Sequence, residues 1–265
     1  MENKDLKEKY EEMHSQGSSS WFGQGDEERE LILKMGEPWN DRILEIGCGE
    51  GILTYAIELK LYPEYETDKT FSFSLADKNV VFGVDYSGVA IQKAKEKYPG
   101  ILFDADDYRK CQWKFDRIVM QGVLEHLDDP FVELKWMMDN LLTEKGDVIT
   151  SSPCFLNPRG IVWMILDMFG AVMSKTDLHF LNPWEFTKFA KDNSYEIKIK
   201  YCDSSWGNGT QMVEDLTQRI PLALKDGNIP YDEVKFNKFM EWLSECAKWM
   251  IRSLGATAVY KIVKL

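Results

Sequence analysis

The chain has few of the residues that build disulfide frameworks, metal motifs or membrane anchors. Its five cysteines include no Cys-x-x-Cys pair, which argues against a disulfide scaffold or a zinc motif and is typical of a reducing compartment such as the cytoplasm. No run of about 18 apolar residues is present, so no membrane partner is expected. The charged N-terminus lacks the apolar stretch of a secretory signal.

Positive charge is also in the minority. The 265 residues include 32 Lys and Arg against 44 Asp and Glu, for a net charge of -12. A phosphate backbone would be repelled overall, and no basic run is interleaved with aromatic residues, so no nucleic acid partner is expected. Hydrophobic residues make up 44%, enough for one α/β domain with embellishments or for two small domains.

Strand and helix patterns alternate along the first half of the chain. Strands are expected at 42–46, 80–84, 101–103, 117–120 and 147–150, and helices at 26–34, 51–60, 87–98 and 131–142. This alternation requires crossover connections, so it predicts a mainly parallel sheet covered on both faces. The second half is less regular, with helices expected at 160–169, 183–191, 213–224 and 232–254 and strands at 195–201 and 257–263.

Glycines and acids follow the expected strands, at the edge of the sheet where open α/β folds bind ligands. Gly47, Gly49 and Gly51 come after the first strand, and their backbone N–H groups can approach a ligand closely. Asp85 and Asp104 follow the next two strands, where a carboxylate can accept from vicinal hydroxyls or a base amino group. A glycine cluster alone is more often a tight turn, and an aspartate alone is more often a helix cap. Their occurrence together, after three successive strands, predicts a ligand site with three parts in sequence order: one for an anionic tail, one for a sugar and one for a base.

Four segments resemble motifs of class I S-adenosylmethionine-dependent methyltransferases. They are RILEIGCGEGILT for motif I, FGVDYSGVAIQKAKEK and FDADDY for the next two, and FDRIVMQGVLEHLDDP, which resembles small-molecule methyltransferases of the ubiquinone-biosynthesis type. The resemblance covers about 42–153, with a looser continuation at LHFLNPWEFTKFAKDNSYEI. It implies a Rossmann-like fold with a mostly parallel seven-stranded sheet flanked by helices, and helical insertions near the active site. The activity it implies is methyl transfer from S-adenosylmethionine to an O, N or C atom of a small-molecule acceptor.

The resemblance also implies a set of cofactor-binding residues: Glu45, Gly47, Cys48, Gly49, Gly51, Asp85, Tyr86, Asp104, Ala105 and Gln121. Glu45 and Gly47 would lie beside the methionine moiety, Asp85 would hold the ribose, and Asp104 would frame the adenine. Some relatives bind a divalent metal through carboxylates that precede the Glu-His pair. The corresponding residues here are Gln-Gly-Val at 121–123, so no metal is expected.

Two histidines are candidates for a general base. His126 follows the end of the fourth strand and His179 precedes a helix, where the resemblance places the active-site rim. For each, a structural hydrogen bond is the alternative role. A nicotinamide enzyme fits less well, because the spacing is G-x-G-x-G rather than G-x-G-x-x-G. A catalytically inert protein of the same fold, acting as a binding or assembly partner, is the second functional alternative.

The domain organisation follows from these assignments. We expect an N-terminal helical cap or flap at 1–40, a cofactor-binding core at 41–153, and the rest of the sheet at 154–265, with helical substrate-cap insertions at 154–178 and 203–254. Trp21 and Phe22 either pin a loop to the core or cover a ligand. The apolar helix at 160–169 is expected to be buried or packed on a partner subunit, in a homodimer, rather than to form a lid. The long connection at 61–79 is expected to be a surface excursion.

Overall fold

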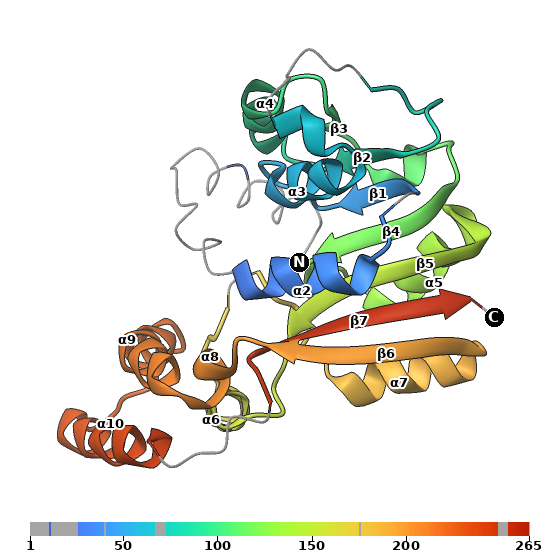
Figure 1. Ribbon diagram of the computed structural model, residues 1–265. Helices are drawn as coiled ribbons and strands as arrows, with labels where there is room; N and C mark the ends of the chain where they lie inside the picture. Colours follow the sequence, from blue (N-terminus) through green and yellow to red (C-terminus); the bar gives the residue numbers. More distant parts are fainter. Residues whose placement is uncertain are drawn as a thin grey trace.

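The structure is a computed structural model that describes residues 11, 26–39, 41–66, 73–174, 176–248 and 254–264. Within these residues, a central sheet has the strand order β3-β2-β1-β4-β5-β7-β6 (Figure 1). Its strands are β1 (Arg42–Ile46), β2 (Val80–Val84), β3 (Leu102–Asp104), β4 (Phe115–Gln121), β5 (Leu142–Pro153), β6 (Tyr195–Cys202) and β7 (Thr257–Lys264). Strand β7 is antiparallel to both of its neighbours, β5 and β6, and the other pairs are parallel, so the predicted mostly parallel seven-stranded sheet is confirmed.

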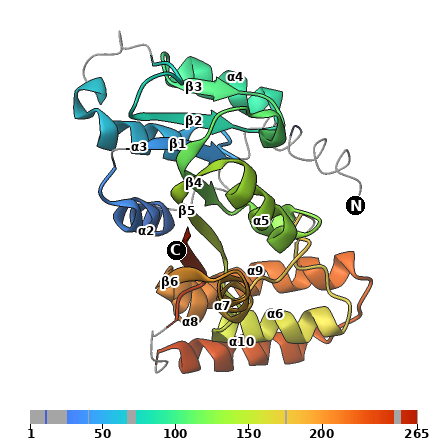
Figure 2. The ribbon, with the colours of Figure 1, turned by 90° about the vertical axis from the view of Figure 1, so that its right-hand side faces the viewer.

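Helices cover both faces of this sheet (Figures 1 and 2). They are α2 (Asp26–Gly36), α3 (Ile52–Leu61), α4 (Gly88–Lys97), α5 (Pro130–Asn140), α6 (Pro158–Met168), α7 (Pro183–Asp192), α8 (Ser204–Asn208), α9 (Thr210–Asp226) and α10 (Glu233–Ala247), with short 3-10 turns η2 (Pro63–Glu66), η3 (Tyr108–Lys110) and η4 (Leu124–His126). Helices α2 and α3 pack on one face, α5 and α7 on the other. Helices α6, α8, α9 and α10 gather beside the end of β6 (Figure 1).

Polar caps explain where several helices begin. The Ser87 hydroxyl accepts a hydrogen bond from the backbone N–H of Ala90 at the start of α4. The Asp129 carboxylate accepts from the N–H of Val132 at the start of α5, where Pro130 occupies the first turn. These side chains satisfy N–H groups that have no partner within the helix, so the helix boundaries are encoded locally.

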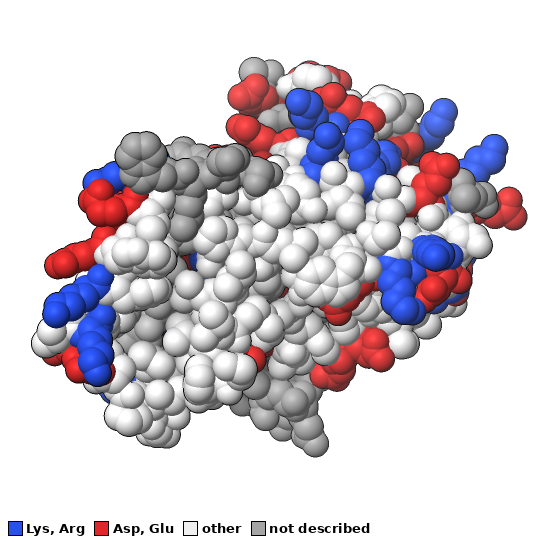
Figure 3. Space-filling model, turned by 90° about the horizontal axis from the view of Figure 1, so that it is seen from below, with Lys and Arg blue, Asp and Glu red and all other residues white. Residues whose placement is uncertain are grey.

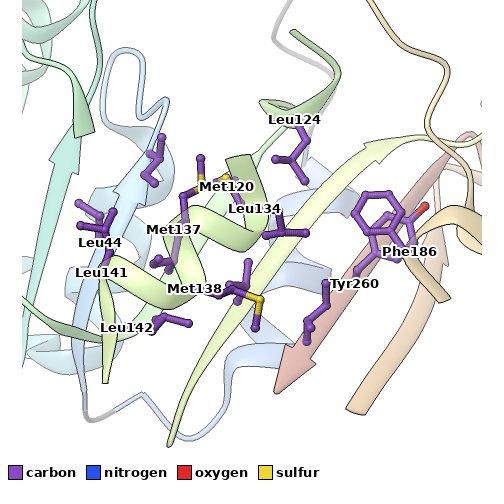
Figure 4. Close-up of a cluster of buried hydrophobic side chains, with 14 of the residues drawn as sticks. Leu44, Met120, Leu124, Leu134, Met137, Met138, Leu141, Leu142, Phe186 and Tyr260 are labelled. Atoms are coloured by element: carbon purple, nitrogen blue, oxygen red, sulfur yellow. The ribbon is translucent and has the colours of Figure 1, made fainter. Parts of the chain in front are cut away.

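The main core lies between the sheet and helices α5 and α7. Its side chains come from β1, β4, β5, β7 and both helices (Figure 4): Leu44, Met120, Leu124, Leu134, Met137, Met138, Leu141, Leu142, Phe186 and Tyr260. The rings of Phe186 and Tyr260 are stacked, with centroids 3.7 Å apart. Burial of this apolar surface on both faces stabilises the sheet edge that carries the site.

A buried ion pair fixes α2 on the opposite face. The Arg117 guanidinium donates to both carboxylate oxygens of Asp147, at 2.6 and 2.9 Å, and to the carbonyl oxygen of Gly36 at the end of α2. Lys261 reaches the same carboxylate at 3.1 Å. Paired charges of this kind compensate the cost of burial, and the bond to Gly36 holds the end of α2 against the sheet.

The connection between α3 and β2 is exposed in part and anchored in part. Tyr65 in η2 is fully buried and Phe73 is 8% exposed, and both pack against Val80 and Ile91 in an apolar cluster. The predicted surface excursion at 61–79 is therefore anchored to the core by two aromatic side chains, while Glu64, Glu66 and Lys78 of the same segment are exposed. Residues 67–72 lie outside the described residues, as does the 15–25 segment with Trp21 and Phe22.

Helix α6 is not buried all round within this chain, and packing of its outer face on a partner subunit stays a prediction. Its Trp163 is 1% exposed, but Ile161, Ile165 and Met168 are 57%, 50% and 71% exposed. The helix is thus buried along one face only, because α8 and α9 cover that face alone. The underside of the molecule carries a broad area without charged side chains (Figure 3). Within the described part of the chain, no helix has the length and apolar character to cross a membrane.

Several element boundaries also differ from the predictions. The 232–254 helix ends at Ala247, α8 was not predicted, and β5 begins five residues before the predicted 147. The short third strand lies at Leu102–Asp104 rather than 101–103, so Asp104 is its last residue.

Candidate functional site

The loop after β1 has the backbone geometry of a ligand cradle. Gly47, Gly49 and Gly51 have φ of +72°, +51° and +80°, in the left-handed region that side chains disfavour. Space is a second reason for glycine at two of these positions. A Cβ on Gly47 would lie 2.6 Å from Val123, and one on Gly51 would lie 2.6 Å from Phe103. The loop can therefore keep this close-packed turn only with glycine at these positions. Its N–H groups are satisfied within the protein, since Gly47 donates to the Val84 carbonyl oxygen at 2.8 Å and Gly51 donates to the Cys48 carbonyl oxygen at 2.9 Å.

Asp85 ties this loop to the next βα unit. One of its carboxylate oxygens accepts from the N–H of Gly49 at 2.9 Å, and the other accepts from the N–H of Ser87 at 2.8 Å. The side chain is half-buried. Its carboxylate is thereby fixed at the carboxyl ends of β1 and β2, with acceptor capacity left for further donors.

The start of α4 is completed by a residue that the sequence analysis did not identify. The Glu11 carboxylate accepts hydrogen bonds from the Ser87 hydroxyl at 3.1 Å and from the N–H groups of Gly88 and Val89 at 2.9 and 3.2 Å. A carboxylate at a helix N-terminus satisfies free N–H groups and complements the helix dipole. No local pattern could link position 11 to position 88.

Glu45 is the innermost acid of the site. It is 2% exposed and accepts a hydrogen bond from the Thr54 hydroxyl in α3. Burial raises the pKa of Glu45 to about 8, so it is largely protonated at neutral pH. The Cys48 side chain is also buried, and burial raises the pKa of its thiol.

Asp104 and Ala105 mark the outer end of the same edge. The N–H of Asp85 donates to the Asp104 carbonyl oxygen at 3.2 Å, and the N–H of Ala105 donates to the Asp104 carboxylate at 2.9 Å. Asp104 is exposed. Tyr86 is half-buried beside Asp85, and burial raises the pKa of its hydroxyl. A shallow cavity of about 390 Å³ borders Ala105, but it otherwise lies along the outer face of α4, away from the glycine loop.

Helix α2 contributes two residues that the sequence analysis missed. The Glu28 carboxylate accepts from the side-chain amide of Gln121 at 2.7 Å, and burial raises the pKa of Glu28. Arg29 donates to Asp26 at 2.9 Å, while its buried Nε has no hydrogen-bond partner. Arg29 also interacts electrostatically with both Glu28 and Glu45. The only local signal for these residues is their place in the first turn of a helix.

The two candidate histidines lie on adjoining loops. His126 Nδ1 is 3.0 Å from the Thr176 carbonyl oxygen and 3.3 Å from a carboxylate oxygen of Asp177. His179 Nε2 is 3.1 Å from the Asp128 carbonyl oxygen. The backbone N–H of His179 donates to the Glu125 carbonyl oxygen at 3.2 Å, which joins the two loops.

The structure thus brings most of the predicted residues to one sheet edge. Gly49 and Asp85 are hydrogen-bonded, and Val123 at the start of η4 packs against Gly47, which places the His126 segment next to the loop. His179 is joined to this segment by its backbone bond to Glu125. In the described ranges, no group of three or more His, Cys, Asp or Glu side chains is placed to hold a metal ion.

Residues 23–185 match the family described as a methyltransferase domain. The search of curated proteins found no match.

Three solved structures are similar over nearly the whole chain. A candidate methyltransferase in complex with the Haloferax volcanii Trm112 methyltransferase activator has a TM-score of 0.60 at 15% identity, covering 98% of this chain and 97% of that one. A candidate histamine N-methyltransferase from Thermotoga maritima has a TM-score of 0.57 at 15% identity, covering 97% and 98%. DhpI, solved with SAH, has a TM-score of 0.55 at 13% identity, covering 97% and 95%.

These likenesses establish the fold, and the family match covers more than half of the chain. The resemblance seen in the motifs is confirmed at this level, whereas the ubiquinone-type subclass stays a prediction. The chain belongs to the methyltransferase domain family and is a class I S-adenosylmethionine-dependent methyltransferase.

Proposed function

We propose that this enzyme transfers the methyl group to an O, N or C atom of a small-molecule acceptor, at the edge formed by β1, β2 and β4. The observation that carries the proposal is the Asp85 carboxylate, which accepts from Gly49 and Ser87 and so fixes the glycine loop against α4. S-adenosylmethionine supplies an electrophilic methyl group on a sulfonium when it is bound. The protein then mainly has to align the acceptor with that group and exclude water.

The described residues fit this cofactor. The glycine loop leaves no room for side chains at Gly47 and Gly51, so its backbone can border the methionine moiety. Asp85 retains acceptor capacity for ribose hydroxyls, and Asp104 is exposed where an adenine amino group could donate. The unpartnered Nε of Arg29 suits the methionine carboxylate, since guanidinium groups bind carboxylates through paired N–H donors.

We assign the proton-accepting role first to His126, with His179 as the alternative. Thr176 and Asp177 both offer oxygen acceptors to Nδ1 of His126, which favours the tautomer with the proton on Nδ1 and the lone pair on Nε2. An acceptor that must lose a proton could pass it to that nitrogen. Turnover that is unchanged in the His126→Gln and His179→Gln double variant would eliminate this role and leave both histidines as structural residues.

The experiment that tests the proposed function is a calorimetric titration followed by a transfer assay. We expect saturable binding of S-adenosylmethionine and S-adenosylhomocysteine, no comparable binding of NAD, and transfer of a labelled methyl group to a component of a small-metabolite extract. Binding without transfer would favour the inert alternative. Binding of NAD alone would favour a nicotinamide enzyme.

Three related expectations stay predictions. The domain boundaries after residues 40 and 153, and the helical substrate-cap insertions at 154–178 and 203–254, are tested by limited proteolysis. A homodimer is tested by analytical ultracentrifugation, and a cytoplasmic location by fractionation of expressing cells.

A further inference from the structure

Helix α6 carries a continuous apolar stripe on the face that it turns away from α8 and α9. Five large side chains at positions i, i+3, i+4, i+7 and i+8 are exposed there: Ile161, Met164, Ile165, Met168 and Phe169. This spacing places them together on one side of the helix, opposite the buried Trp163. We call these five residues the α6 stripe.

The α6 stripe is large for a surface that stays in water. Its side chains are on average about half exposed, and a side chain of this size covers about 150–250 Å², so the stripe amounts to roughly 500–600 Å². The largest apolar patch on a typical monomer is of about this size and is often functional. A specific protein interface covers about 800 Å² on each partner, so the stripe supplies about two-thirds of one. Val172, exposed just beyond the helix, extends it.

Charge favours a second copy of this chain as the occupant of the stripe. Each copy has a net charge of -12, so two copies repel each other except where their surfaces are uncharged. The underside of the molecule, where α6 and α10 lie in Figure 1, shows a broad area without Lys, Arg, Asp or Glu side chains (Figure 3). The two charged residues of α6, Arg159 and Asp167, lie outside the stripe. A like-charged copy can therefore approach on this face.

A lipid surface fits the α6 stripe less well. Helices that lie on membranes combine an apolar face with a polar face rich in Lys and Arg, which anionic headgroups attract. The only basic residue of α6 is Arg159, and its guanidinium donates to the Asp215 carboxylate at 2.8 Å. The net negative charge of the chain also opposes binding to anionic headgroups.

We propose that the protein forms a two-fold symmetric homodimer in which the α6 stripes of two copies pack against each other in antiparallel orientation. A two-fold interface uses the same patch on both copies, so that patch must be self-complementary. The α6 stripe meets this condition, because Ile161 and Phe169 stand at equal distances on either side of Ile165. Ile165 then lies near the two-fold axis, and Ile161 lies opposite Phe169 of the partner subunit. The homodimer expected from the sequence is thereby assigned to one helix.

Sedimentation velocity of the full chain over about 0.1–100 µM tests this dimer. We expect a reversible dimer, and Ile165→Glu and Met168→Glu should each raise its Kd about 100-fold or more, because two-fold symmetry puts every substitution into the interface twice. Val132→Glu adds the same charge at an exposed apolar residue of α5, so it is the matched control and should dimerise like the wild type. Ile165→Cys should give a disulfide-linked dimer on mild oxidation, whereas Val132→Cys should not.

The outcomes are distinct. A wild type that stays monomeric over this range, or that assembles beyond the dimer, overturns the proposal, and so does a dimer that both glutamate variants leave intact. Binding of a monomeric wild type to phosphatidylcholine vesicles that Ile165→Glu abolishes would also overturn it, in favour of a lipid surface. An unchanged melting temperature in either glutamate variant keeps the comparison valid, and the cysteine pair decides if both variants misfold. None of these measurements involves the cofactor, so a failure here leaves the proposed function untouched.

Discussion

Replacing Asp85 by asparagine perturbs the cofactor site with almost no change in side-chain volume. Its two carboxylate oxygens accept from different backbone donors, Gly49 and Ser87, so an amide NH₂ in either orientation must face one of these N–H groups. One charge-assisted hydrogen bond is lost, and the negative charge that would accept from the ribose hydroxyls is lost as well. Hydrogen bonds to charged groups contribute about 1.5–3 kcal/mol each.

These losses set the size of the expected effect. A combined loss of about 2–4 kcal/mol corresponds to a Kd for S-adenosylhomocysteine about 30- to 700-fold higher than that of the wild type. Calorimetric titration measures it, with Asp192→Asn in the exposed last turn of α7 as the matched control. Binding by Asp85→Asn within about threefold of the wild type, with an unchanged melting temperature, would refute the reasoning.

Four further predictions follow from the described contacts. Gly51→Ala should destabilise the fold by about 2–4 kcal/mol and weaken cofactor binding, because Gly51 has a positive φ and the added Cβ would lie 2.6 Å from the Phe103 ring. Gly88→Ala should have neither effect, since the nearest atom to its added Cβ is a carboxylate oxygen at 3.8 Å. Chemical denaturation compares the stability of the two variants. Burial raises the pKa of Glu58 from its usual 4.5 to about 8, so the folded state holds the extra proton and the wild type loses stability as pH rises from 5 to 8. Glu58→Gln should match the wild type at pH 5 and be more stable by on the order of 2–4 kcal/mol at pH 8, and equal stability at pH 8 would contradict this. Asp147→Ala should lower the free energy of unfolding by about 3–5 kcal/mol, since it removes the two-point carboxylate partner of a buried guanidinium and leaves only the longer 3.4 Å pair with Asp41. A loss below about 1 kcal/mol would show that the pair contributes little. Arg29→Gln should raise the Kd for S-adenosylhomocysteine about tenfold or more but leave the Kd for adenosine unchanged, and an equal effect on both ligands would argue against a carboxylate contact.

The parts of the fold that could be predicted are those encoded locally. Apolar runs between polar turns located β1 and β2 at their observed bounds, and apolar spacing over 87–98 located α4 to within one residue of its observed bounds. The alternation of strands and helices then left a parallel sheet as the consistent arrangement. Gly47, Gly51 and Asp85 were identified because chemistry at strand ends repeats across this fold.

The parts that could not be predicted depend on contacts between distant segments. Glu11 reaches α4 across about 76 to 78 positions, and Glu28 meets Gln121 across 93. Nothing near these residues in the sequence encodes such pairings. The burial of α6 was overestimated because an apolar composition shows that a helix can be buried, but not whether a second layer covers its outer face.

The central claim is that one glycine loop and the Asp85 carboxylate hold the adenosyl cofactor at a single sheet edge. A crystal structure of the protein grown with S-adenosylhomocysteine tests this most directly. The account predicts that the homocysteine moiety lies along residues 45–51, that both ribose hydroxyls donate to Asp85, and that the adenine lies beside Asp104. Cofactor density elsewhere on the protein, or a ribose with no contact to Asp85, would contradict it.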